Sequence, residues 1–218
     1  MDKSVGDLLS LLDELEIADN TLVVFTSDNG GLSHDRRSMG PPHSHNRPLS
    51  SGKGAHHEGG IRVPLLVRWP GQIAGQTSAD TPVILYDWFP TLLEIAGAPA
   101  PETTDGYRLL PLLTDPDATL PERPLVWHFP NFWGPLEYPA PVQGPGMGPS
   151  STIRRGDWKL IYYHTDQRFE LFNLAEDLGE RNNLADQEPE RLRQLAEELS
   201  AYLQERGAVM PVRKADGK

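Results

Sequence analysis

An apolar run that stops abruptly at polar residues constrains the fold of this chain more than any other feature. Residues 21–31 read TLVVFTSDNGG, so β-branched and aromatic residues without charge are followed by polar residues and a glycine pair. Such a run predicts a buried strand, and Asp28 and Asn29 then lie at its carboxyl end. Open α/β sheets bind their ligands at the carboxyl ends of strands, so the pair is a candidate binding site.

Asp28 and Asn29 offer a carboxylate oxygen and an amide oxygen side by side. Hard oxygens of this kind are the ligands that Ca²⁺ and Mg²⁺ prefer. The composition Asp-Asn-Gly is also typical of a simple turn, which would bind nothing. The strand before the pair and a basic motif after it favour metal ligation by Asp28 and Asn29.

The basic motif spans residues 52–64 and reads GKGAHHEGGIRVP. Glycines flank Lys53 and let the backbone approach a ligand closely, which favours a binding role over a solvated surface charge. Arg62 is expected to pair with a carboxylate such as Glu58 and so hold the loop in shape. Together with Asp28 and Asn29, this motif predicts part of a site for an anionic ester.

Histidines gather in the same region. The stretch holds His34, His43, His45, His56 and His57. Their spacing matches no helical metal pair, so ordinary polar loop residues are favoured over a zinc site. If one of them contributes to a substrate site, His56 or His57 is best placed, next to the lysine, and we choose His57. Outside this stretch, His128 stands among aromatic residues suited to a glycan. We therefore expect both to line a substrate pocket, against the alternative that the aromatics around His128 form core.

Both motifs, in this order, resemble the sulfatase family. The similarity continues through residues 105–113 (DGYRLLPLL), 153–160 (IRRGDWKL) and 170–174 (ELFNL), and covers nearly the whole chain. Sulfatases hydrolyse sulfate esters with a formylglycine nucleophile beside a divalent metal, usually Ca²⁺. The resemblance implies that Asp28 and Asn29 bind this metal. It also implies that Lys53 is a catalytic residue that contacts the sulfate and offsets charge on the leaving oxygen.

The segment that supplies the nucleophile has no match here. In the family, formylglycine arises from Cys or Ser in the pattern Cys/Ser-x-Pro-x-Arg, whereas this chain has no cysteine and no serine in that pattern. The resemblance therefore implies the C-terminal half of a sulfatase, inactive alone and dependent on its N-terminal half as a partner. Whether Met1 is the natural start stays open. No signal peptide or transmembrane run is evident, and the compartment stays open as well.

Two other functions remain open from the sequence. The chain could belong to a related phosphonate or phosphodiester hydrolase of the alkaline-phosphatase superfamily, although Lys53 and residues 58–60 favour sulfate. It could also be a non-enzymatic metal- or glycan-binding module. A net charge of −11 argues against nucleic acid and anionic membranes as partners. The expected partner is a sulfated glycan or a sulfated small molecule such as an aryl sulfate.

The predicted fold class is α/β: the C-terminal part of a sulfatase-like mixed sheet flanked by helices, then a small antiparallel sheet with a terminal helix. We expect an α/β part over 1–124, a small subdomain over 125–206 and a frayed tail over 207–218. Full cover on both faces is expected for the apolar strands, unless the rest of their sheet is missing. The Asp157-Trp158-Lys159 run predicts a turn before a structural strand. The predicted helices are 5–17, 87–96 and 189–205, and the predicted strands are 21–26, 63–69, 126–129, 151–155, 158–163 and 169–172.

Overall fold

The computed structural model describes residues 1–32, 46–99, 101–115, 117–131 and 148–212. Its contacts divide the chain into two compact units. The first unit comprises residues 1–26 and 64–121, and the second comprises residues 27–63 and 122–218. The predicted division at residues 124 and 206 stays a prediction, and these contact units differ from it because they group 27–63 with the C-terminal part.

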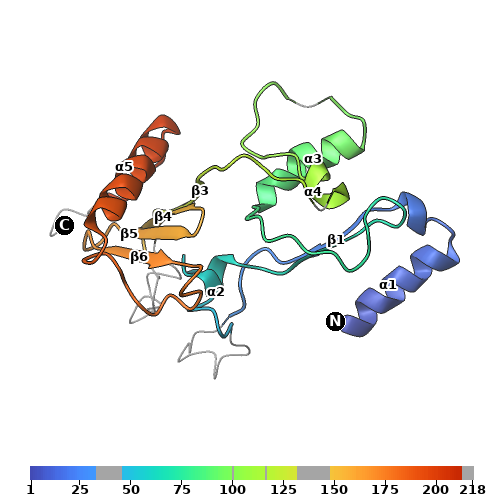
Figure 1. The fold of residues 1–218 in the computed structure, drawn as a ribbon, viewed down its shortest axis with the longest axis horizontal. Helices are drawn as coiled ribbons and strands as arrows, with labels where there is room; N and C mark the ends of the chain where they lie inside the picture. The colour runs from blue at the N-terminus through green and yellow to red at the C-terminus, as the bar shows by residue number, and fades with distance from the viewer. Residues whose placement is uncertain (33–45, 100, 116, 132–147, 213–218) are drawn as a thin grey trace, which may run out of the picture. The chain divides into compact units, whose positions relative to one another are not determined.

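The first unit combines helices with a short antiparallel ribbon (Figure 1). The two strands pair along their whole length, from Val23 opposite Arg68 to Thr26 opposite Leu65. A buried carboxylate organises the helical part, because Asp87 accepts hydrogen bonds from the backbone N–H groups of Ile84 and Tyr107. The elements are α1 (Asp2–Glu14), η1 (Ala18–Asn20), β1 (Val23–Thr26), β2 (Leu65–Arg68), η2 (Leu85–Asp87), α3 (Trp88–Ile95) and α4 (Leu110–Thr114).

The apolar side chains of this ribbon and its helix are poorly covered. All of β1 is half-buried, Leu66 of β2 is 62% exposed, and α1 has no buried residue. Of the two expectations for these strands, full cover or an exposed apolar surface where the rest of the sheet is missing, the second describes this ribbon. The described residues of the first unit supply no further strand to extend the ribbon, and its apolar surface remains open as predicted for a sheet without its other strands.

The second unit is a four-stranded antiparallel sheet in the order β3-β4-β5-β6, with one long helix (Figure 1). The predicted helix 189–205 and the predicted strand 158–163 match their observed bounds, and the other three strands match within one residue. Periodicity succeeded here because both faces of each strand are patterned. The elements are α2 (Glu58–Ile61), β3 (Leu125–Phe129), β4 (Ser150–Arg155), β5 (Trp158–Tyr163), β6 (Phe169–Asn173) and α5 (Pro189–Glu205).

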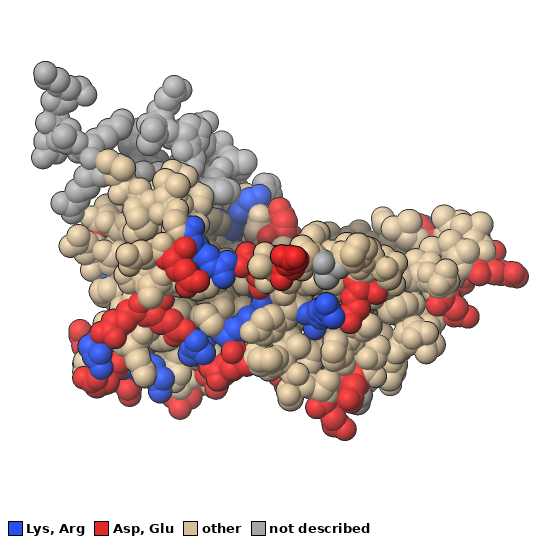
Figure 2. Space-filling model, turned by 90° about the horizontal axis from the view of Figure 1, so that it is seen from above, with Lys and Arg blue, Asp and Glu red and all other residues tan. Residues whose placement is uncertain are grey.

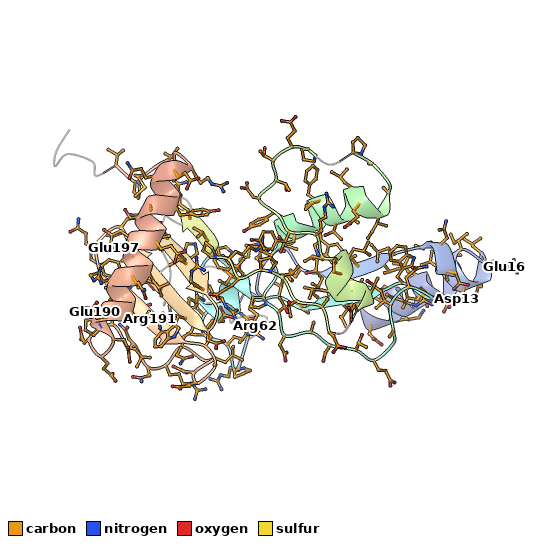
Figure 3. All side chains as sticks on the ribbon, turned by 45° about the horizontal axis from the view of Figure 1, so that its top comes forward. Asp13, Glu16, Arg62, Glu190, Arg191 and Glu197 are labelled. Carbon is orange, nitrogen blue, oxygen red and sulfur yellow. The ribbon has the colours of Figure 1, made fainter. Side chains whose placement is uncertain are left out.

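Helix α5 closes the core over one face of this sheet. Ile153, Leu160 and Leu171 from three adjacent strands are fully buried there, and they pack against leucines of the helix. The leucines are Leu195, Leu199 and Leu203. On the exposed side of α5, Glu190 and Glu197 point outward, in agreement with the amphipathic pattern (Figure 3).

The opposite face of the sheet carries several polar side chains. Successive residues of a strand point to opposite faces, so the residues between the core positions reach this face. β5 contributes Lys159 and Tyr163 to this face, and β6 contributes Glu170. The residues of the lysine motif pack here, and Figure 1 shows α2 on the side of the strands away from α5. Acidic and basic side chains are interspersed on the molecular face seen in Figure 2. Within the described residues, every helix is too short or too polar to cross a bilayer.

Candidate functional site

The structure joins the two sequence motifs through their backbones. The N–H of Lys53 donates to the carbonyl of Gly31 at 3.1 Å, and the N–H of Gly30 donates to the carbonyl of Gly60 at 2.9 Å. Asn46 braces the same region: its amide exchanges two hydrogen bonds with Gly31 and donates a third to the carbonyl of Ser51. The turn after β1 and the lysine motif therefore form one locally bonded structure, here called the site loop pair (residues 27–32 and 46–62).

Close backbone contacts explain the glycines of this loop pair. A Cβ atom on Gly30 would lie 1.8 Å from the Gly59 carbonyl oxygen. A Cβ on Gly60 would lie 2.1 Å from the Ala55 oxygen and 2.6 Å from the Gly52 oxygen. No side chain fits at these distances, so glycine is required for the approach of the two segments. The glycine pairs noted in the sequence thus hold the site together.

Asp28 and Asn29 lie at the end of β1 as predicted, with Asp28 exposed and Asn29 half-buried. The Asn29 amide nitrogen donates to the Gly30 carbonyl at 3.0 Å, which orients the amide. Neither the Asp28 carboxylate nor the Asn29 Oδ1 accepts a hydrogen bond from another residue of the described chain. Asp28 and Asn29 thus offer two hard oxygen donors from adjacent residues, the ligand type that Ca²⁺ and Mg²⁺ take, although such an ion needs about six ligands or more in total.

This donor set fits a hard cation but supplies only part of its coordination shell. Across the described ranges, no group of three or more His, Asp or Glu side chains is arranged to hold a metal. Ligands from elsewhere would have to complete the shell. Lys53 is half-buried next to this turn, and its side chain has a partner of its own.

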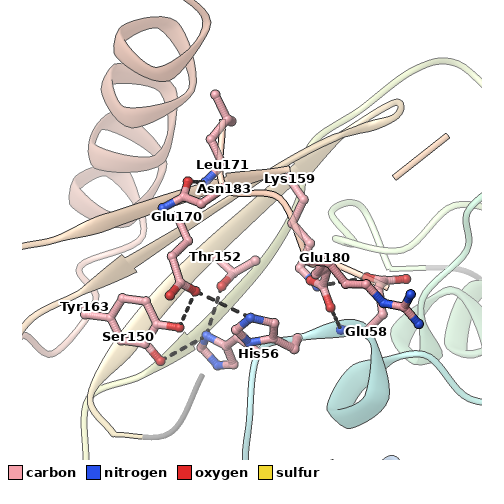
Figure 4. Close-up of polar contacts among 12 residues, drawn as sticks. His56, Glu58, Ser150, Thr152, Lys159, Tyr163, Glu170, Leu171, Glu180 and Asn183 are labelled. Carbon is pink, nitrogen blue, oxygen red and sulfur yellow. Dashed lines mark hydrogen bonds and ion pairs between the residues drawn. The ribbon is translucent and has the colours of Figure 1, made fainter. Parts of the chain in front are cut away.

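Three consecutive residues of the lysine motif, from His56 to Glu58, each contact a different strand of the sheet (Figure 4). His56 contacts β4: its Nδ1 lies 3.0 Å from Thr152 Oγ1 and 3.3 Å from Ser150 Oγ. Burial, reinforced by the positive charge of Lys159, lowers the pKa of His56 to about 3. The neutral imidazole therefore shares a hydrogen bond with the hydroxyl of Thr152 and fastens the loop to β4.

His57 is in the interior, 3% exposed, rather than at an open surface. Its Nε2 lies 3.4 Å from Glu170 Oε2 of β6, and its ring contacts Phe172 at 5.7 Å between centroids. Burial lowers the pKa of His57 to about 4, against the opposing effect of Glu170. Its Nδ1 is buried and has no hydrogen-bond partner among the described atoms. These surroundings hold the ring in place; the predicted contact with substrate stays a prediction.

Glu58 enters a buried cluster of charges on β5. Lys159 Nζ donates to Glu58 Oε1 at 2.8 Å and forms an ion pair of the same length with Glu180 Oε1. The Glu58 backbone N–H donates to Glu180 Oε2 at 2.7 Å. Arg62 and Arg154 lie 3.6 and 3.9 Å from Glu58 Oε2, which confirms the predicted Arg62–Glu58 pair.

The electrostatics of this cluster differ between its two acids. Burial alone would raise the pKa of Glu58, but the combined effect of Lys159, Arg154 and Arg62 lowers it below its ordinary value, so Glu58 is charged. Burial dominates at Glu180 and raises its pKa to about 7, although Lys159 acts in the opposite direction. Lys159 itself is fully buried. A buried ion cluster of this kind requires all its partners, since an unpaired charge in the interior is costly.

His128 lies elsewhere in the second unit, on β3. Its Nδ1 is 2.7 Å from Ser151 Oγ, and its Nε2 is 2.9 Å from the Val209 carbonyl. Since Nε2 faces a carbonyl, it carries the proton, and Ser151 then donates to Nδ1. His164 Nε2 reaches the same hydroxyl at 2.7 Å. His128 thus ties the chain after α5 to the sheet, and no described contact brings it to the loop pair. His34, His43, His45 and the aromatics Phe132, Trp133 and Tyr138 lie outside the described residues.

Comparison with known families assigns both motifs. Residues 1–98 match the family model described as sulfatase, and residues 52–208 match the model for the C-terminal region of N-sulphoglucosamine sulphohydrolase. The second match alone covers more than half of the chain. This chain belongs to the sulfatase family. The predicted resemblance is confirmed, and so is its restriction to the C-terminal half.

Curated sulfatases from bacteria and animals are similar to this one over most of its length. A sulfatase of Formosa agariphila is 35% identical over 206 residues, which cover 87% of this chain and 34% of the relative. Human N-acetylgalactosamine-6-sulfatase is 32% identical over 97% of this chain and 42% of its own length. Human steryl-sulfatase is 46% identical over 52% of this chain and 20% of its own. The present sulfatase chain therefore spans about a third of the length of the first of these relatives.

Solved structures show the same fold. Ps i-CgsB superimposes with a TM-score of 0.70 at 28% identity, over 92% of this chain and 40% of its own. BT4656, solved with its substrate D-glucosamine-2-N,6-O-disulfate, gives a TM-score of 0.71 at 25% identity, over 93% and 38%. The predicted α/β class with a small antiparallel sheet and terminal helix is confirmed.

Sequence reasoning missed the residues that anchor the lysine motif of this sulfatase. Lys159 was assigned to a turn and a structural strand, and Glu180 received no role. A signal was present for Lys159, because it shares the inward phase of β5 with Ile161 and Tyr163. Glu180 follows Gly179 in an irregular stretch, at a positive φ of 50°, where neither periodicity nor composition marks a partner.

Proposed function

We propose that this chain is the C-terminal part of a sulfatase that hydrolyses sulfate esters of a glycan. In this proposal Asp28 and Asn29 bind Ca²⁺, and Lys53 contacts the sulfate. The observation that carries the proposal is the hydrogen bond from Lys53 N–H to the Gly31 carbonyl. It places the lysine motif beside the two available oxygen donors, and a cation next to an ammonium group suits a dianionic or monoanionic ester.

The roles of these residues follow from their chemistry. A bound Ca²⁺ would neutralise sulfate charge and stabilise the charge that develops on the reacting oxygens. Asp28 and Asn29 hold the ion through their oxygens, and the hydrogen bond from Asn29 to Gly30 keeps the amide turned for this. Lys53 offsets charge on the leaving oxygen. The nucleophile must come from a formylglycine segment that this sequence lacks, so the chain supplies charge stabilisation and shape.

A sulfated glycan is proposed as the substrate class because relatives act on such molecules. BT4656 was solved with D-glucosamine-2-N,6-O-disulfate, and Ps i-CgsB was solved with a neocarrahexaose. Steryl-sulfatase is also among the relatives, so the test includes a small aromatic sulfate. His57 and His128 are also proposed to contact the substrate, His57 from within the loop pair and His128 through the aromatic residues near it in sequence.

The test uses a protein that joins this chain to a formylglycine-bearing N-terminal half. Lys53→Ala should lower kcat by about 10²- to 10³-fold, as for the loss of one group that stabilises transition-state charge. Lys3→Ala, at an exposed lysine of α1, is the control and should keep full turnover. Unchanged hydrolysis of both the glycan and the aryl sulfate by Lys53→Ala would refute the proposal.

The metal role has a separate readout. Calorimetric titration of the same protein with Ca²⁺ should show binding that Asp28→Ala abolishes, while Asp19→Ala, at an exposed position of η1, leaves it intact. Equal Ca²⁺ affinity in Asp28→Ala would remove Asp28 from the metal site. Ca²⁺ binding without turnover in the joined protein would favour a binding module over an enzyme.

A further inference from the structure

A buried cluster of charged side chains holds the lysine motif against the sheet, and the proposed chemistry does not use these charges. Lys159 is fully buried on β5, 101 residues away from Glu58 in sequence, and its ammonium group contacts Glu58 and Glu180 at 2.8 Å each. Figure 4 shows Lys159 and Glu180 converging on Glu58 at the start of α2. The three side chains are removed from solvent, so none of them can contact a substrate directly.

The contacts continue from this cluster to Lys53 through α2. Glu58 begins α2, and its N–H is fixed by Glu180 Oε2. Two residues later, the backbone of Gly60 rests against the carbonyl oxygens of Gly52 and Ala55, which flank Lys53 on either side. The Gly60 carbonyl accepts from Gly30 N–H, next to the proposed metal ligands. A shift of α2 would therefore displace both the lysine and the metal turn.

We propose that Lys159 is a positioning residue for Lys53: with Glu58 and Glu180 it fixes α2 and thereby sets the place of the lysine motif against the turn that holds Asp28 and Asn29. The catalytic relevance of this role rests on the proposed function, whereas the structural part can be tested on this chain alone. The larger apolar core lies on the opposite face with α5, and a smaller cluster of Ile161, Tyr163, Phe172 and Leu174 lies apart from it.

Hydrogen exchange measured by mass spectrometry tests the structural part. Lys159→Met keeps the length of the side chain and removes its charge. Exchange at backbone amides of residues 52–62 should rise by at least about ten-fold more than exchange at amides of β4 and β5, which rises only as far as the global stability falls. Glu180→Gln, which removes the charge at the same shape, should act in the same direction with a smaller effect.

A matched control separates positioning from general loss of stability. Leu199→Ala opens a cavity under α5, on the face of the sheet away from the lysine motif. It should loosen β4 and β5 without a selective change at residues 52–62. If Lys159→Met and Leu199→Ala give the same exchange pattern, the positioning role is overturned, and the same holds if Lys159→Met leaves residues 52–62 unchanged.

Kinetics in the joined protein give the second readout. Normalised to folded protein, Lys159→Met should lower kcat by about ten- to a hundred-fold with little change in KM, because misplacement of Lys53 weakens the transition state more than the ground state. Leu199→Ala should keep kcat per folded molecule. A Lys53→Ala variant with normal turnover would refute the proposed function, while the exchange result on Lys159 would stand or fall independently.

Discussion

In the second unit, Ile153, Leu160 and Leu171 are fully enclosed between the sheet and α5, whereas in the first unit Leu8 of α1 and Leu66 of β2 are 64% and 62% exposed. Both units contain amphipathic elements, but only one supplies the partner layer for them. A two-stranded ribbon has marginal stability in water without such a layer. The difference indicates that the second unit carries its own core, and that the first contributes one layer of a larger domain. The greater length of the sulfatase relatives agrees with this interpretation.

The largest effect that would sharpen this comparison is expected from Gly30→Ala. Its Cβ would lie 1.8 Å from a backbone oxygen of Gly59, so the two segments must separate. We expect a loss of unfolding free energy of about 4 kcal/mol or more in the second unit, as for severe overpacking. Gly6→Ala in α1 is the control, because nothing lies within 4 Å of its Cβ and alanine favours a helix. Chemical denaturation followed by circular dichroism measures both, and equal stability of the two variants would contradict the account of the loop pair.

Lys159→Met should follow, with a loss of about 3–5 kcal/mol, because it removes the buried ammonium group that contacts both Glu58 and Glu180. The measurement is again urea denaturation of this chain. Lys3→Met, at a lysine exposed on α1, should cause no measurable change. A small cost for Lys159→Met would mean that water reaches the cluster, and the second unit would then be less closed than described.

Core truncation tests the comparison directly. Leu199→Ala should destabilise the second unit by about 2–5 kcal/mol, since the leucine is 3% exposed and its cavity cannot be refilled by solvent. Leu8→Ala, the same substitution on the exposed face of α1, should have no measurable effect in this chain. In the joined protein we expect Leu8→Ala to become costly. The measurement is the melting temperature of the parent and of Leu8→Ala, each in this chain and in the joined protein. A neutral Leu8→Ala in the joined protein would contradict the interpretation of α1 as an uncovered layer.

Acid should destabilise the second unit more than the first, because every described histidine belongs to the second. The folded-state pKa of His56 is about 3 and that of His57 about 4, both below the ordinary value of 6.5. The unfolded state therefore binds more protons, and unfolding free energy falls as pH drops below 6.5, by up to about 1.4 kcal/mol per pH unit and histidine.

Glu180 opposes this trend in part. Its folded-state pKa of about 7 lies above the ordinary value of 4.5, so its protonation favours the folded state as pH falls from 7 to 4.5. Two histidines outweigh one acid, and a net loss of about 2 kcal/mol is expected between pH 6.5 and 5. Hydrogen exchange at both pH values should show faster opening of the second unit, and His56→Gln should reduce the loss. Equal pH sensitivity of the first unit would contradict the assignment.

Periodicity predicted most of this architecture. The strand 158–163 and the helix 189–205 have strong alternation and a clear apolar stripe, so their bounds matched. The five-residue α4 was missed because Pro111 stands inside a Pro-rich connector and offers less than two turns of pattern. β1 is half-buried and not covered on both faces. Its apolar residues show that the strand needs a packing partner on each face, but they do not show which chain segment provides it.

The sequence predicted the contacts of the candidate site between residues close in the chain and missed those between residues far apart. Residues close in sequence, such as Asp28 with Asn29 and Arg62 with Glu58, were found from local pattern. The anchors of the lysine motif were not, because Lys159 and Glu180 reach Glu58 across 101 and 122 residues, and no local pattern encodes such a contact. His56 was considered as a loop histidine or, like His57, as a substrate-site residue, and its hydrogen bond to Thr152 of β4 was not foreseen.

The bracing of Gly31 by Asn46 has a consequence for how sulfatases of this type can diverge. The two residues are 15 positions apart in sequence, yet two hydrogen bonds fix the ends of the intervening stretch next to each other. Lys53 is bonded to Gly31 itself, so its position is set at this junction and not by the number of residues between Gly31 and Asn46. Changes in chain length between these two residues can therefore leave Lys53 in place.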